Sequence, residues 1–177
     1  EQADRLTVST LPASHSWFHA DEERIFSRLD AMSGFLDVLG RQTGRLMQLG
    51  LEPEPFGHFH DTDGAIRFFN GLRNRSRRPE LIERHLGLTY DTCHFAILRE
   101  EPEFTLSAWE ENNIALCKVQ FSNALECRIC GEEDLERLRQ FDDGVYFHQT
   151  SILHREGAML FPDLPNALAY GRDYAEE

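Results

Sequence analysis

The sequence lacks an uninterrupted apolar run of about 18 residues, the length that a helix needs to cross a bilayer. We therefore expect no membrane span. Residues 1–5 also lack an initiator Met and the apolar stretch of a signal peptide, so we expect the chain to be a piece of a longer protein.

Basic residues are scarce. The 177 residues include 18 Lys and Arg against 31 Asp and Glu, which gives a formal net charge of −13. Proteins that bind nucleic acid non-specifically need clustered cations to release counterions from the phosphates, so this balance argues against a nucleic-acid partner. The one basic cluster spans residues 73–78, and we expect it to form a solvated loop.

Cysteine is scarce as well, with residues at positions 93, 117, 127 and 130. A chain of this size does not need disulfides to be stable, so we expect a reducing compartment and a cytoplasmic location. Cys127 and Cys130 have the spacing of half a zinc knuckle or of a redox pair, but no second pair completes a structural zinc site. Cys93 and Cys117 are expected to fill small apolar gaps.

Short apolar runs alternate with amphipathic stretches along the chain. Strand-like runs occur at residues 5–11, 46–51, 87–91, 114–121 and 144–150, and helical patterns at 21–44, 65–72, 79–85, 104–111 and 132–141. This alternation predicts an α/β fold with a parallel sheet. Because no glycine-rich phosphate loop follows a strand, a Rossmann or P-loop site is not supported. The length would suit an open, doubly wound sheet, whereas a closed barrel takes about 250 residues.

Polar residues gather where the second and third strands end. Glu52 follows the run at 46–51, Asp91 ends the run at 87–91, and His94 comes three residues later. Strands that deliver such side chains at their carboxyl ends favour a barrel-type site, and carboxylates with an imidazole suit Mn, Zn, Mg or Co better than Ca. Each residue also has a structural interpretation: Glu52 beside prolines can begin a stiff loop, Asp91 can cap the next turn, and His94 can be a core histidine.

Four segments together carry a resemblance to a known family. They are Leu51-Glu52-Pro53-Glu54-Pro55, Asp91-Thr92-Cys93-His94, the run from Lys118 to Leu125, and Tyr146-Phe147-His148-Gln149. The chain resembles the xylose-isomerase-like TIM-barrel superfamily, which contains sugar isomerases, epimerases and the endonuclease IV enzymes. Over residues 46–177 it is most similar to the E-protein family of the Ebo metabolite-traffic gene clusters.

The resemblance implies a (β/α)8 TIM barrel with a divalent metal at its C-terminal mouth. The chain would form a single domain over residues 1–177, the central to C-terminal part of the barrel, with about five βα units. Glu52, Asp91 and His94 would hold the metal, and Glu52 and His94 would be catalytic. Gln120 stands where many members carry a metal-binding His, which departs from the family pattern.

Other polar side chains are candidates for binding a substrate. They are Gln120, His148, Gln149, His58 and His60, all in or beside the segments that follow strands. Trp17, between His15 and His19, either stacks on a sugar or fills the top of the barrel.

Three functions remain open from the sequence. The first is a metal-dependent isomerase or epimerase of a small, sugar-like metabolite, and the second is a protein that binds or escorts such a metabolite without converting it. The third, an endonuclease IV-like phosphodiesterase, is opposed by the negative charge. An incomplete barrel would leave two sheet edges open, so we expect either a homo-oligomer or a larger parent chain.

Overall fold

A computed structural model of the chain describes residues 4–11, 13–144, 149–154 and 157–174, without the side chains of 172–174. The chain divides into two compact units, Glu1–Ser122 and Asn123–Glu177. The single domain expected over residues 1–177 stays a prediction.

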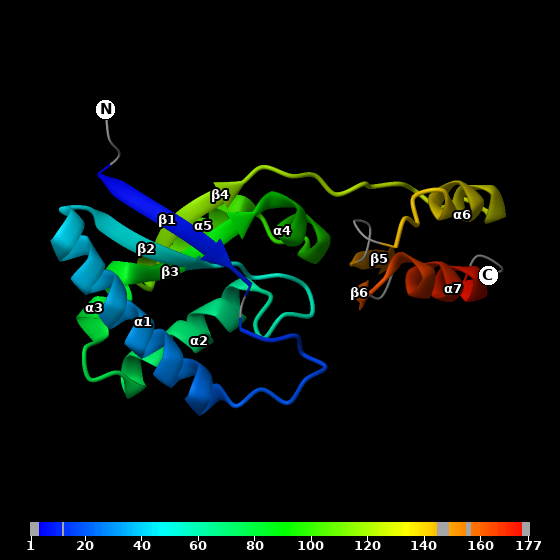
Figure 1. Cartoon of the computed structure of the whole chain (residues 1–177). Helices are drawn as coiled ribbons and strands as arrows, with labels where there is room; N and C mark the ends of the chain where they lie inside the picture. Colours follow the sequence, from blue (N-terminus) through cyan, green and yellow to red (C-terminus); the bar gives the residue numbers. More distant parts are fainter. Residues whose placement is uncertain (1–3, 12, 145–148, 155–156, 175–177) are drawn as a thin grey trace. The chain divides into compact units, whose positions relative to one another are not determined.

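The first unit alternates strands with helices (Figure 1). Its elements are β1 (Arg5–Thr10), α1 (Glu22–Thr43), β2 (Leu46–Leu51), α2 (Thr62–Arg75), α3 (Pro79–His85), β3 (Leu86–Asp91), α4 (Thr92–Leu98), α5 (Pro102–Glu111) and β4 (Ala115–Gln120). The four strands pair in parallel in the order β1-β2-β3-β4, and the sheet curls into a half-barrel. The predicted α/β fold with parallel βα units is therefore confirmed, and the sheet is compatible with an incomplete barrel.

Capping residues set the limits of the longer helices. The Asp21 side chain accepts a hydrogen bond from the Arg24 backbone N–H (3.1 Å) at the start of α1. Gly44 ends this helix with φ +69°, a left-handed conformation that glycine adopts without a Cβ clash. Both ends of α1 were predicted from the sequence, and both are confirmed.

One local feature was not predicted, and one expectation was only partly right. None of the helical patterns predicted α4, which begins immediately after β3. The basic cluster at 73–78 is a loop only in part, since Arg73 and Arg75 lie in the last turn of α2. Arg73 donates a hydrogen bond to the Asn112 carbonyl (2.8 Å), and Arg75 pairs with Glu23 (2.5 Å), so both guanidinium groups have partners within the protein.

The helix-covered face of the sheet carries the core. Tyr90 of β3 stacks on Phe95 of α4 with 4.4 Å between ring centroids, and Trp109 of α5 packs edge-on against both rings at 5.9 and 5.5 Å. Leu86 and Leu88, on the same side of β3 as Tyr90, are fully buried. Large apolar side chains packed in this way supply most of the favourable energy of folding.

The opposite, concave face of the sheet leaves little room for side chains. A Cβ on Gly50 would lie 2.5 Å from Thr89 Oγ1, and one on Gly87 would lie 2.2 Å from the Ala115 carbonyl oxygen, so only glycine fits at these positions. Side chains also connect the two outer strands, because Arg5 of β1 donates to the Leu116 carbonyl (2.6 Å) of β4. This strong curl brings the carboxyl ends of β2, β3 and β4 together.

The second unit contains α6 (Glu132–Arg139), β5 (Thr150–His154), β6 (Gly157–Phe161) and α7 (Leu164–Tyr174). β5 and β6 pair with each other in antiparallel orientation. The predicted strand at 144–150 falls largely on residues 145–148, which lie outside the described residues. The described chain has four strands in the parallel sheet, one fewer than the five predicted units. In the part of the chain that the structure describes, no helix combines the length and apolarity that crossing a membrane requires.

Candidate functional site

Three polar side chains meet at the carboxyl end of the parallel sheet. Glu52 follows β2, Asp91 ends β3, and Gln120 ends β4 directly opposite Asp91 in the strand register. The Gln120 amide nitrogen donates hydrogen bonds to Glu52 Oε1 (2.8 Å) and to Asp91 Oδ2 (2.7 Å). Both carboxylates are largely buried. The structure thus brings together the two acids that the sequence placed at neighbouring strand ends.

Asp91 accepts more hydrogen bonds than its neighbour. Its Oδ1 accepts from the Cys93 backbone N–H (3.0 Å) and from the Ser122 hydroxyl, so Asp91 also caps α4, as its structural interpretation predicted. Burial alone would raise the pKa of Asp91, but the hydrogen bonds from Ser122, Gln120 and Cys93 outweigh it and hold this pKa below its ordinary value. Asp91 is therefore an anion at neutral pH.

The pKa of Glu52 is shifted in the opposite direction, above its ordinary value. Burial raises its pKa, the nearby charge of Asp91 raises it further, and His94 opposes both effects. Two adjacent carboxyl groups whose pKa values are pushed apart are the usual arrangement for one fixed anion and one group that exchanges a proton. In this pair the carboxyl group of Glu52 holds its proton more tightly than that of Asp91.

His94 lies in the first turn of α4 with its ring beside Glu52. Its Nδ1 is 3.2 Å from the Pro53 carbonyl oxygen and 3.6 Å from Glu52 Oε1. Because a carbonyl only accepts, Nδ1 is the donor, and in the neutral ring Nε2 then carries the lone pair. His94 can therefore offer Nε2 to a cation or a substrate.

Cys93 is the member of this region that sequence reasoning did not identify as functional. Side-chain donor atoms of Asp91, Cys93 and His94 all lie within 4.8 Å of one another, and this is the one such group of potential metal-binding residues among the described residues. Burial raises the pKa of the Cys93 thiol to about 11, with Asp91 and Glu52 adding to the rise and a Ser122 hydrogen bond opposing it. Its place between Asp91 and His94 in the sequence was the available signal.

Lys118 is a second residue whose role the sequence did not reveal. Its ammonium group donates to Gln120 Oε1 and to Ser9 Oγ (3.1 Å) of β1. Since an ammonium group cannot accept, this contact turns Oε1 of Gln120 toward Lys118 and the amide nitrogen toward the carboxylates. Lys118 and Gln120 are two residues apart on β4, the spacing that places side chains on one face of a strand.

Two of the remaining predicted residues, His58 and His60, contact other acids. His58 lies 3.6 Å from Glu22 of α1 and packs against Phe68, and His60 lies 3.4 Å from Asp61, the cap of α2. The contacts of these two histidines are thus with acids other than Glu52 and Asp91. Gln149 belongs to the second unit, next to β5, and His148 lies outside the described residues.

Aromatic side chains gather in the loops beside the carboxylates. The His15 ring is stacked with Phe56 at 6.3 Å and edge-on to Trp17 at 4.6 Å, and the Ser16 N–H donates to the Phe56 carbonyl (2.7 Å). Trp17 is 67% exposed, so it does not fill the top of the half-barrel. Burial raises the pKa of Glu54, while His94 and His15 both oppose the rise.

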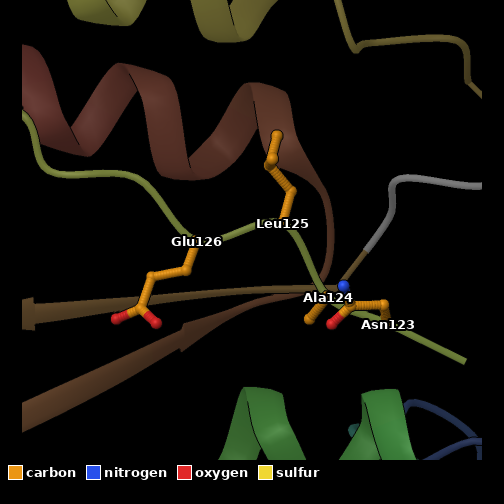
Figure 2. A pocket seen from close by; sticks show the side chains of 4 residues that line it. All are labelled: Asn123, Ala124, Leu125 and Glu126. Atoms are coloured by element: carbon orange, nitrogen blue, oxygen red, sulfur yellow. The ribbon is translucent and has the colours of Figure 1, made fainter.

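The second unit holds an open cavity of about 550 Å³ (Figure 2). Its lining residues, Asn123 to Glu126, are consecutive in one extended segment, and the Leu125 and Glu126 side chains project to opposite sides of it. The residues that line it do not include Glu52, Asp91, His94 or Gln120.

No protein-family model matches the chain, and no curated protein matches it either. The xylose-isomerase-like identity therefore stays a prediction.

Proposed function

We propose that the protein is a metal-dependent isomerase or epimerase of a small polyhydroxylated metabolite. The observation that carries this proposal is the position of the Gln120 amide nitrogen, within 2.8 Å of both the Glu52 and the Asp91 carboxylates. Two acids that share one donor and lie beside an imidazole form a concentrated negative site at the carboxyl end of parallel strands, where barrel enzymes carry their chemistry.

The donor set fits a divalent cation. Asp91 is an anion, His94 offers Nε2, and Glu52 lies beside both. The Gln120 amide nitrogen now supplies the positive end of a dipole to Asp91, and a bound cation would replace that contact. When bound, such an ion would polarise a substrate carbonyl.

The side chains of the chain would handle the proton. Glu52, whose pKa is raised by burial, would take the proton from the carbon next to the carbonyl and return it to a neighbouring carbon or to the opposite face. Asp91 would remain ionised and fixed by its hydrogen bonds. The exposed rings of Trp17 and Phe18 would contact the apolar C–H face of a sugar-like molecule, while its hydroxyl groups face the polar strand ends.

The test is exchange of solvent deuterium into a panel of pentose and hexose aldoses and ketoses, followed by NMR with the full chain. We expect exchange that depends on added metal and is lost in Glu52→Gln. Metal content is measured in parallel and should fall in Asp91→Asn. Glu103→Gln, on the exposed surface of α5, is the matched control and should leave both unchanged. Full metal content in Asp91→Asn would remove Asp91 from the site.

A second function is favoured by one specific observation. Gln120 already donates hydrogen bonds to both carboxylates, and Lys118 holds its amide in that orientation. Both carboxylates therefore have a hydrogen-bond donor without a cation. Such a site suits a protein that binds a metabolite through hydrogen bonds and does not convert it. Saturable binding of a panel member with no deuterium exchange at any metal concentration would select this function over the enzyme.

A further inference from the structure

Three side chains at the end of β3 and in the first turn of α4 form a compact set of donors. Asp91, Cys93 and His94 offer an oxygen, a sulfur and a nitrogen that all lie within 4.8 Å of one another. Ser122 fixes this set from the segment after β4, because its hydroxyl donates to Asp91 Oδ1 and accepts from the Cys93 N–H (3.1 Å). Asp91 is buried, and the other two are half-buried.

We propose that Cys93 is a metal ligand together with Asp91 and His94, and that the site takes a thiophilic divalent cation of the zinc class. This inference rests on the proposed function, since it assigns the ligands and the metal class of the same site. Thiolate with imidazole selects zinc or cobalt, whereas magnesium and manganese prefer oxygen donors.

The orientation of His94 supports ligation independently of the cluster. Histidines that bind a metal through one ring nitrogen almost always donate a hydrogen bond from the other to a carbonyl or a carboxylate. Here Nδ1 donates to the Pro53 carbonyl (3.2 Å) with Glu52 at 3.6 Å, which leaves Nε2 for the metal. Donor atoms around a tetrahedral zinc are roughly 3.3–3.8 Å apart, given zinc bonds of about 2.0–2.3 Å, so small side-chain rotations complete the site.

Binding of a divalent cation at these three side chains releases one proton and leaves the site electrically neutral. The metal–sulfur bond forms as the S–H bond of Cys93 breaks, and the proton leaves to solvent, with no oxidant or reductant involved. The Cys93 thiolate and the Asp91 carboxylate then neutralise the two positive charges, and His94 remains neutral. Three protein ligands leave a fourth position for water or substrate, as in catalytic zinc sites. Glu52 stays outside the ligand set and keeps its proton-exchanging role.

The test uses cobalt(II) as a spectroscopic substitute. The full chain is prepared with Cys127→Ser and Cys130→Ser, because these two exposed thiols have a spacing that binds metals on its own. Titration with cobalt should produce the near-ultraviolet charge-transfer band of a cobalt–thiolate bond and the intense visible bands of a tetrahedral ion. Zinc should displace the cobalt, and excess magnesium should not.

Two single variants then identify the thiol. Cys93→Ser should abolish the charge-transfer band and weaken cobalt binding by more than the roughly 10–100-fold that loss of an outer partner costs. Cys117→Ser, which changes the buried cysteine of β4, should keep the band. Cys93→Ala serves if the serine variant does not fold, as judged by circular dichroism.

The outcomes separate the ligand assignment from the proposed function. Cobalt that binds in a manner dependent on Asp91 and His94, but without a charge-transfer band, overturns Cys93 as a ligand and leaves the metal-dependent enzyme standing. A band that persists in the Cys93 variants also overturns the assignment. Absence of any cobalt binding by the parent overturns both this inference and the metal-dependent function.

Discussion

The two faces of β3 show how one strand serves two purposes. On the helix-covered face, Leu88 and Tyr90 are buried among aromatic rings. On the concave face, Gly87, Thr89 and Asp91 meet glycine, backbone and polar side chains. The first face is stabilised by packing, and the second by close approach and hydrogen bonds. Substitutions on the first should therefore cost stability, whereas those on the second should change the geometry and charge of the strand ends.

The largest effect is expected on the packed face. Trp109→Ala should lower the free energy of unfolding by about 3–5 kcal/mol, because the side chain is 1% exposed and contacts both Tyr90 and Phe95. Urea denaturation followed by circular dichroism measures this. Trp17→Ala is the matched control, and should stay within about 0.5 kcal/mol because that ring is 67% exposed. Equal effects of the two variants would contradict the assignment of the core.

The next largest loss of stability is expected from a substitution on the concave face. Gly87→Ala should lower the free energy of unfolding, measured in urea, by up to about 3 kcal/mol. The added Cβ would lie 2.2 Å from the Ala115 carbonyl oxygen and 2.7 Å from Cys117 Sγ, so β4 would have to move. Gly131→Ala is the control, since nothing lies within 4 Å of a Cβ there. If Gly87→Ala is as stable as this control, the sheet does not curl as tightly as described.

The fold of the first unit was predictable because its signals are local. Alternating apolar runs located the strands, and Asp21 and Gly44 marked both ends of α1. The convergence of Glu52 and Asp91 also followed from the sequence, since parallel neighbours end at the same edge of a sheet. These inferences need only periodicity, capping and strand direction.

The remaining features depend on contacts between distant residues. The bridge from Gln120 to both acids requires the curl of the sheet, which Gly50 and Gly87 permit through approaches that no local pattern reports. Cys93 became a candidate because its thiol lies close to Asp91 and His94 where α4 begins directly after Asp91. His58 and His60 illustrate the converse, since sequence proximity to Glu52 did not bring them to it.

Asp91 offers a smaller but sharper test of the concave face. In the presence of a chelator, Asp91→Asn should lower the free energy of unfolding in urea by about 2 kcal/mol at neutral pH. The reason is that the charged acceptor of the Ser122, Gln120 and Cys93 hydrogen bonds is lost. The folded pKa of Asp91 is lowered, so its contribution is present above the ordinary pKa of 3.8 and disappears as the pH falls through the folded value. The variant and the parent should therefore converge in acid, and a constant difference at every pH would contradict this origin.

Glu52 should give the smallest effect, with the opposite sign. Its folded pKa is raised above the ordinary 4.5, so the folded state binds the proton more tightly than the unfolded chain does. The resulting stabilisation is complete below pH 4.5 and is lost as the pH rises through the folded pKa, where the buried carboxyl must ionise.

With a chelator present, Glu52→Gln should not show this loss of stability. At neutral pH the variant should unfold at a higher urea concentration than the parent, but not in acid. Glu103→Gln, on the exposed surface of α5, should show no such crossover. A Glu52 variant that is less stable than the parent at neutral pH would show that the ionised carboxylate is held there by its hydrogen bond from Gln120, and the two acids would then have the same role.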